Sequence, residues 1–250
     1  MSLLRVENVT KRFGSLVAVG GVSLVVEPGE LRAVIGPNGA GKTTFFNLIS
    51  GFLTPSSGRI IFDGEDVTDV LPARRVWRGM ARTFQITEVF PELSTYENVQ
   101  IAVEVAAGYR LRMHLSQAEK TKVRQRTEEL LEMSGLSHKS TRLVGEMSHG
   151  DQRAIEIMMA LALNPRLLLL DEPTAGMGDQ ETHDITQLIR RLHRDQKLAM
   201  VLIEHDMRVV LHLAERIMVL AEGLMLAEGT PHEVTSNEAV QAAYLGTAAA

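Results

Sequence analysis

Polar and apolar residues alternate with a period of two near the start of the chain. Residues 4–7 read Leu-Arg-Val-Glu, and residues 22–26 read Val-Ser-Leu-Val-Val. Side chains that alternate in this way lie on opposite faces of a strand, so one face is buried and the other meets solvent. We therefore predict half-buried antiparallel strands here, then a turn at Pro28-Gly29 and a short strand over 31–35.

Apolar residues at helical spacing predict four helices that each bury one face. The sets are Phe45, Leu48, Ile49 and Phe52; Ile155, Met158, Met159 and Leu163; Ile185, Leu188, Ile189 and Leu192; and Met207, Val210, Leu211 and Ala214. Apolar runs between them predict strands over 58–62, 167–170 and 198–203, and a hairpin over 217–220 and 224–228. Strands that alternate with helices form a mostly parallel sheet covered on both faces, so the predicted fold class is α/β.

The segment between residues 87 and 146 differs from the rest. Strand patterns fade, and residues 102–107, 116–126 and 127–133 all favour helix. We predict a helical insertion. Its basic residues are interpreted as a solvated helix face, with Arg124 and Glu128 spaced i, i+4, and contact with a membrane partner or anionic headgroups is the alternative.

Composition narrows the class of protein. The chain has 250 residues, 26 Lys and Arg against 31 Asp and Glu, and a formal charge of −5. A pI near 5.9 gives no sign of the basic surface that binds nucleic acid, so we exclude nucleic acid as a partner. The sequence has no cysteine, no apolar stretch long enough to cross a bilayer and no recognisable secretion signal, so we expect a cytoplasmic protein.

One segment matches the pattern of a phosphate-binding loop, GxxxxGK[ST], between a predicted strand and a predicted helix. Backbone N–H groups of such a loop surround phosphate oxygens, and the helix that follows adds its positive end. Lys42 can contact the β- and γ-phosphates, the Thr43 hydroxyl can hold Mg²⁺, and Thr44 can add a phosphate hydrogen bond. We predict a nucleoside triphosphate site at Gly36, Pro37, Asn38, Gly39, Ala40, Gly41, Lys42, Thr43 and Thr44.

Two adjacent acidic residues, Asp171 and Glu172, end the apolar run 167–170. Ligands of a parallel sheet gather at the carboxyl ends of its strands, where this pair and the phosphate loop both lie. The hypothesis is that Asp171 orients Mg²⁺ and that Glu172 accepts a proton from the attacking water. A helix cap at the exit of the strand is the structural alternative.

Further motifs, in the same order along almost the whole chain, resemble those of the nucleotide-binding subunits of ABC transporters. Gln85 is similar to the family glutamine that reaches Mg²⁺ and water. Residues 147–151 (Met-Ser-His-Gly-Asp) stand in place of the LSGGQ signature. His205 resembles the switch histidine that senses the γ-phosphate, and Phe13 the aromatic residue that stacks on adenine. Taken singly, each has an ordinary structural interpretation, such as a loop glutamine or a sheet-edge phenylalanine.

The resemblance implies a P-loop NTPase (RecA-like) fold in a single ATPase domain. It implies a core with an antiparallel β subdomain over 1–86 and 147–230, a helical subdomain over 87–146, and a short C-terminal helix and tail over 231–250. For the site, it implies ATP and Mg²⁺ as cofactors. Catalytic roles then fall to Lys42, Gln85, Glu172 and His205, and metal-binding roles to Thr43, Gln85 and Asp171.

Subunits of this family work in pairs, so the resemblance implies a second ATPase subunit, either another copy or a related chain. ATP would be sandwiched between Lys42 of one subunit and Ser148 and Gly150 of the other, at the start of a helix. Three residues depart from the family pattern. They are His149 for a glycine, Asp151 for a glutamine and Gly178 for an aspartate. We therefore do not expect two equal sites.

Phrases at 82–85, 204–207 and 243–246 are similar to the importer branch for branched-chain amino acids, urea, amides and aromatic acids. That branch implies two permease subunits, a periplasmic binding protein and a place on the cytoplasmic face of the inner or plasma membrane. Phe84, Phe90 and Leu93 form the candidate groove for a permease helix. An exporter subunit, a non-transport P-loop ATPase and a P-loop kinase are the alternatives, and a kinase would need an acceptor pocket and a lid.

Overall fold

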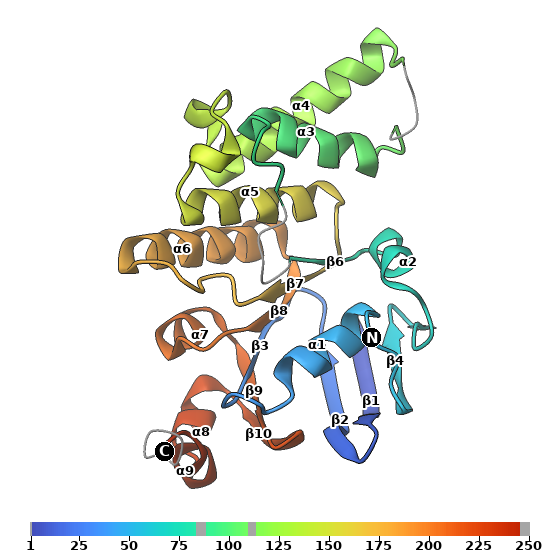
Figure 1. The fold of residues 1–250 in the computed structure, drawn as a ribbon, viewed down its shortest axis with the longest axis vertical. Coiled ribbons are helices and arrows are strands. Elements are labelled where there is room, and N and C mark those ends of the chain that lie inside the picture. Colours follow the sequence, from blue (N-terminus) through green and yellow to red (C-terminus); the bar gives the residue numbers. More distant parts are fainter. Residues whose placement is uncertain (1, 84–88, 110–113, 246–250) are drawn as a thin grey trace.

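The computed structural model describes residues 2–83, 89–109 and 114–245. Figure 1 shows an elongated molecule in which the helices of the middle segment lie at one end, and the sheets and C-terminal helices lie toward the other. Two sheets and the helices around them form the body of the described structure.

The larger sheet has six strands in the order β10-β9-β3-β8-β7-β6. Neighbouring strands pair in parallel from β9 to β6, whereas β10 is antiparallel to β9. The prediction of a mostly parallel sheet that ends in a hairpin is therefore confirmed. The bounds are β3 Leu31–Ile35, β6 Met80–Arg82, β7 Leu167–Asp171, β8 Ala199–Ile203, β9 Arg216–Ala221 and β10 Leu224–Gly229.

The smaller sheet is antiparallel, in the order β2-β1-β4-β5. The period-two pattern sets its faces, because Leu4 and Val6 are buried while Arg5 between them is exposed. The strands predicted near the start of the chain are confirmed. The bounds are β1 Leu4–Phe13, β2 Leu16–Val26, β4 Ser57–Phe62 and β5 Glu65–Asp66.

Alternate residues of the larger sheet enter two separate hydrophobic cores. Leu168 and Leu170 of β7 pack into the core formed with the helices of the second half of the chain. Leu167 and Leu169 pack into the other core, with Phe45 and the smaller sheet. A central parallel strand is thus buried on both faces, which explains why β3, β7 and β8 have continuous apolar runs.

Nine α-helices occur in the described residues, together with 3₁₀ turns at Ser137–Lys139 and Val144–Glu146. The segment predicted as a helical insertion holds α3 and α4, which pack on each other and on α5. Across all the described residues, every helix is too short or too polar to span a bilayer. The bounds are α1 Lys42–Ser50, α2 Pro72–Trp77, α3 Thr95–Ala106, α4 Gln117–Ser134, α5 His149–Ala162, α6 Asp179–Gln196, α7 Met207–Leu213, α8 Pro231–Thr235 and α9 Glu238–Leu245.

Two predicted helix faces each include one residue that the structure leaves exposed. Phe52 lies beyond α1, because Gly51 adopts a left-handed conformation (φ 83°) and terminates the helix, and its side chain is half exposed. Leu211 of α7 is exposed, and the buried residues of this short helix are Val209, Val210 and Leu213. The predicted helices at 116–126 and 127–133 form the single helix α4, bounded by a Ser116 capping box and Gly135.

Candidate nucleotide-binding and hydrolysis site

The predicted phosphate loop connects β3 to α1, as its pattern requires. Close approach of the backbone explains two of its glycines. A Cβ at Gly36 would lie 2.1 Å from the Leu220 carbonyl oxygen, and one at Gly41 would lie 2.4 Å from that of Ala18. Any side chain at either position would push the loop away from β2 and β9.

Lys42 begins α1 and turns its side chain back over the loop. Its ammonium group donates hydrogen bonds to the carbonyl oxygens of Gly36 (2.7 Å) and Pro37 (3.0 Å). Burial lowers the pKa of Lys42, and the nearby charge of Glu172 opposes that shift. The loop thus holds a cation that phosphate oxygens can take over from the two carbonyl groups.

A cavity of about 540 Å³ lies over the loop and gathers residues from distant parts of the chain. That volume suits a nucleotide-sized ligand. Phe13 of β1, with 48% of its surface exposed, stands in the wall of this cavity. The other predicted site residues that line it are Asn38, Gly39, Ala40, Gly41, Lys42, Thr43, Thr44, Glu172 and His205.

Glu172 and His205 meet at the edge of this cavity, although 33 positions separate them. They follow the neighbouring strands β7 and β8, and Glu172 Oε1 lies 2.6 Å from His205 Nε2. Glu172 also has a left-handed backbone (φ 46°), which is costly for a residue with a side chain. The Glu172 carboxylate, which a strained backbone positions beside the half-exposed His205 imidazole, is suited to proton transfer.

Asp171 lies one residue earlier and is almost fully buried. Its Oδ2 accepts a hydrogen bond of 2.7 Å from Arg82 Nη2, at the end of β6. The Arg82 guanidinium also lies over the rings of Phe46 and Phe52, at 5.2 and 5.5 Å from their centroids. Sequence reasoning missed this contact of Arg82, because no strand was predicted over residues 80–82 and Asp171 lies 89 positions away.

These residues suit Mg²⁺ better than a metal held by protein alone. Within the described residues, no group of three or more His, Cys, Asp or Glu side chains could hold a metal ion. Mg²⁺ is bound in many phosphate sites by one or two protein oxygens together with phosphate and water. The Thr43 hydroxyl in the cavity and the Asp171 carboxylate behind it fit that pattern. Gln85, the third predicted metal residue, lies outside the described residues, as does Phe84.

The signature segment forms the start of α5, and Ser148 is its N-cap. The Ser148 hydroxyl oxygen accepts a hydrogen bond from the Asp151 N–H at 3.2 Å, while Asp151 Oδ2 pairs with Lys139 at 2.6 Å. Ser148 and Gly150 do not line the cavity above the phosphate loop but a second one of about 370 Å³. Within one chain, the helix tip and the loop therefore belong to separate sites.

Buried charges connect the segments around Glu172. Arg153 of α5 forms a buried ion pair with Glu156 (2.6 Å), and its Nη2 donates to the main-chain oxygen of Glu172 (3.1 Å). Glu204 accepts hydrogen bonds from the Thr174 N–H (3.0 Å) and the His205 N–H (2.8 Å). Sequence reasoning missed both connections, because Arg153 lies 19 positions from Glu172 and Glu204 lies 30 positions from Thr174.

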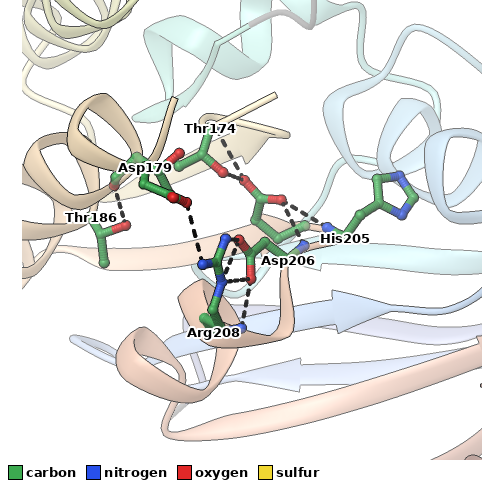
Figure 2. A network of polar contacts seen from close by, with 8 residues as sticks. Thr174, Asp179, Thr186, His205, Asp206 and Arg208 are labelled. Atoms are coloured by element: carbon green, nitrogen blue, oxygen red, sulfur yellow. Dashed lines mark hydrogen bonds and ion pairs between the residues drawn. The ribbon is translucent and has the colours of Figure 1, made fainter. Parts of the chain in front are cut away.

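Figure 2 shows the second of these connections, with Thr174 and His205 held on either side of one carboxylate. It also shows Arg208 between Asp206 and Asp179. Arg208 Nη2 lies 2.7 Å from Asp206 Oδ2, and Nη1 lies 3.3 Å from Asp179 Oδ1. Asp179 follows Gly178, which gives α6 no side-chain cap. Because the Asp206 N–H also donates to the Glu204 carboxylate (3.4 Å), His205 and the start of α6 belong to one polar network.

Comparison with known proteins agrees with this geometry. A family model described as ABC transporter matches residues 19–175, and one described as branched-chain amino acid ATP-binding cassette transporter matches residues 225–250. The high-affinity branched-chain amino acid transport ATP-binding protein BraF of Pseudomonas aeruginosa is 38% identical, over 98% of each chain. The lipopolysaccharide export system ATP-binding protein LptB of Haemophilus influenzae is 36% identical, also over 98% of each chain.

Solved structures give the same result. The ADP conformation of MJ1267, an ATP-binding cassette of an ABC transporter, has a TM-score of 0.84 and 32% identity, with 98% of this chain and 99% of that chain covered. The dimeric structure of MJ0796, a bacterial ABC transporter cassette, has a TM-score of 0.75 and 28% identity, with 91% and 98% covered.

The fold and the loop define a P-loop nucleotide-binding protein. The protein belongs to the ABC transporter family, as an ATP-binding subunit. Its enzymatic activity is ATP hydrolysis coupled to transport. Members of the family bind nucleotide, dimerise and act with membrane permeases.

Proposed function

We propose that this protein is the ATPase subunit of an importer for branched-chain amino acids or related small polar solutes, such as urea, amides or aromatic acids. The observation that carries the catalytic part is the Glu172–His205 contact of 2.6 Å at the edge of the phosphate-loop cavity. The substrate class is supported by the printed name of BraF and by the C-terminal family match.

Glu172 acts as the general base in this proposal. Its carboxylate lines the cavity, and the left-handed backbone turns it away from the direction in which β7 runs. It accepts a proton from the water that attacks the γ-phosphate. His205 holds the carboxylate in place before ATP binds and contacts the γ-phosphate afterwards, so it reports the presence of the third phosphate. Gln85 is proposed to orient the same water.

Lys42 and the loop supply the positive charge. The Lys42 ammonium moves from the Gly36 and Pro37 carbonyl oxygens to the β- and γ-phosphates, while loop N–H groups and Thr44 bind the remaining oxygens. Mg²⁺, when bound, would supply further positive charge to the phosphate groups. Thr43, Gln85 and Asp171 would hold it, with Asp171 itself oriented by Arg82. Phe13 would stack on adenine.

The active form is proposed to be a dimer. The start of α5 opens into its own cavity rather than toward the loop of the same chain, so Ser148 and Gly150 are available to ATP on a partner. The partner is a second copy or a related cassette. ATP then holds the two subunits together, and hydrolysis releases them.

Transport requires proteins outside this chain. We propose that this subunit lies on the cytoplasmic face of the membrane and binds two permease subunits. A periplasmic binding protein is an indirect partner, through those permeases. The half-exposed Phe90 and the partly buried Leu93 follow Gln85 in the chain, and with Phe84 they are proposed to accept a permease helix. An exporter is the second candidate function, because LptB is nearly as similar as BraF.

The catalytic proposal is tested by ATP hydrolysis in Glu172→Gln. Loss of a general base lowers turnover by about 10²–10⁴-fold, and ATP binding should remain. Glu215→Gln is the matched control, because Glu215 also accepts a contact of 3.1 Å from a histidine, His193, outside the cavity. Rapid hydrolysis by Glu172→Gln would exclude Glu172 as the base.

The transport proposal is tested with the native complex, purified from membranes and reconstituted in vesicles. Uptake of leucine, isoleucine, valine or a related solute should require ATP on the side of this subunit and should stop in Glu172→Gln. Movement of a lipid in the opposite direction, without uptake of any of these solutes, would favour the exporter.

A further inference from the structure

The tip of α5 already binds a carboxylate of its own chain. Glu181 lies in the first turn of α6, and its Oε1 accepts a hydrogen bond of 3.2 Å from the Gly150 N–H. Gly150 and Ser148 are the residues that the proposed function assigns to a partner's ATP, whose terminal phosphate oxygens accept hydrogen bonds from such a helix tip. A carboxylate and a phosphate oxygen therefore need the same donors.

The contact is closely fitted. A Cβ at Gly150 would lie 3.2 Å from the Cβ of Glu181 and 3.3 Å from its Cγ, so the absence of a side chain at Gly150 gives the glutamate its place. Glu181 is partly buried against the tip and lines the same cavity as Ser148. The start of α5 and the first turn of α6 thus touch at this carboxylate.

Electrostatics favour the ionised form of Glu181 there. Its pKa is lowered, first by the hydrogen bond from the Gly150 N–H and then by one from the Ser148 side chain, with a smaller effect of the charge of His149. The N-terminus of a helix carries partial positive charge and free N–H groups, which stabilise an anion. The glutamate is the anion that this chain itself supplies.

Asp151, the other acidic residue at the tip, does not compete for this place. Its Oδ2 is 2.6 Å from Lys139 Nζ, and its N–H is used by the Ser148 hydroxyl oxygen. Asp151, which stands where the family has a glutamine, therefore forms an ion pair with Lys139 beside the tip, and its charge is neutralised there. The carboxylate on the Gly150 N–H is Glu181.

We infer that Glu181 is a further residue of the composite ATP site, which occupies the tip of α5 until a γ-phosphate on the partner subunit displaces it. The inference rests on the proposed function, because it needs the tip to bind ATP in a dimer. Glu181 then sets how much ATP is needed to bring two subunits together.

The cavity beside the tip can receive the displaced side chain. It has a volume of about 370 Å³, and Arg191 lines it together with Glu181. Rotation of the Glu181 side chain within this cavity would keep its charge near the Arg191 cation. When only a fraction of the subunits has a free tip, the apparent dissociation constant rises by the inverse of that fraction.

The test uses the Glu172→Gln chain, mixed with its second cassette if the native complex contains one. Dimer formation is followed by light scattering while ATP is added with Mg²⁺. Removing the competing carboxylate in Glu181→Ala should lower the ATP concentration at half-dimerisation by about threefold to tenfold. Glu181→Gln, which keeps the length but loses the charge, should lower it less.

Asp184→Asn is the matched control. Asp184 lies one turn further along α6 and lines the same cavity, but its carboxylate accepts a hydrogen bond of 2.9 Å from Gln180 on its own helix. Equal effects of Asp184→Asn and Glu181→Ala would mean that general charge repulsion is responsible, and would overturn the inference.

Two further outcomes separate this inference from the proposed function. Suppose that Glu172→Gln forms dimers with ATP, and that adding Glu181→Ala leaves unchanged or raises the ATP concentration at half-dimerisation. The inference is then wrong and the proposed function stands. If no variant forms dimers, the proposed function fails and the inference with it. Thermal unfolding of each variant, with a midpoint within a few degrees of the parent chain, establishes that the comparison is between folded proteins.

Discussion

The Arg153 guanidinium donates a hydrogen bond of 3.1 Å to the main-chain oxygen of Glu172. This contact joins the helix that begins with the signature segment to the residue proposed as the general base. A change at the tip of α5 can therefore reach the base of the same chain through one side chain. In the proposed dimer, this hydrogen bond links the site for a partner's nucleotide to the site for the chain's own nucleotide.

Variants of Arg153 should distinguish its effect on the free energy of unfolding from its effect on ATP turnover. Arg153→Met removes the buried cation that pairs with Glu156, which should cost about 3–5 kcal/mol of unfolding free energy. The double variant Arg153→Met, Glu156→Met should recover most of that loss, because an apolar pair of similar volume is tolerated there. ATP turnover should stay reduced, by about tenfold, since the Glu172 carbonyl loses its donor. Urea unfolding and steady-state hydrolysis measure the two effects. Full turnover in the double variant would contradict the connection.

Arg75 connects the C-terminal end of α1 to the segment that follows β5. Its side chain is fully buried and donates to five carbonyl oxygens, those of Leu48, Ile49, Val67, Thr68 and Val70. Burial lowers the pKa of Arg75 to about 10. Arg75→Met should lower the free energy of unfolding by about 3 kcal/mol or more, because these acceptors lose their donor in the interior. Arg74→Met, exposed on the same helix, is the control and should change it by less than about 0.5 kcal/mol.

Phe13 should contribute to nucleotide affinity through its ring. Stacking of a base on an aromatic side chain is worth about 1–3 kcal/mol, so Phe13→Ala should weaken ATP binding by about fivefold to a hundredfold. Phe13→Trp should retain affinity. Phe90→Ala is the control, since Phe90 has the same exposed fraction of 48% and lies outside the cavity. Titration calorimetry on the isolated subunit gives the constants; equal affinities for Phe13→Ala and the parent chain would remove Phe13 from the adenine site.

Lowering the pH should destabilise the N-terminal turns of α3 and α8. Glu97 and Glu233 accept hydrogen bonds from Ser94 and Thr230 in capping boxes, which lower the pKa of both carboxyl groups below 4.5. A depressed carboxyl pKa stabilises the folded state above the unfolded value and loses that contribution as the pH falls through the folded value. The urea midpoint should thus decrease between pH 5 and pH 3. The double variant Glu97→Gln, Glu233→Gln should show a shallower decrease, and an unchanged slope would contradict the assignment.

Much of the fold followed from local patterns. The apolar runs at β3, β7 and β8 and the spacing of Ile185, Leu188, Ile189 and Leu192 on α6 placed the sheet and its covering helices. Errors arose where one residue overrides a pattern. Gly51 terminates α1 before Phe52, and this was visible only as a single glycine inside an apolar run.

The site was predicted where chemistry is encoded in a short segment. The phosphate loop and the adjacent Asp171 and Glu172 are of this kind, and motif order supplied His205. The partners Arg82, Arg153 and Glu181 were missed because each acts across the tertiary structure. Arg82, for example, meets Asp171 from 89 positions away. Residue type alone gave no reason to pair them, since most charged residues of such a chain lie in solvent.

The central claim is that ATP joins two subunits, each of which contributes the tip of α5 to nucleotide on the phosphate loop of the other. Light scattering on Glu172→Gln with ATP and Mg²⁺, alone and mixed with the second cassette of the native complex, measures this most directly. The expected result is a mass twice that of the 27.6 kDa chain, or that of the mixed pair, which returns to monomer when ATP is removed. A monomer that persists at saturating ATP in both samples would contradict the account.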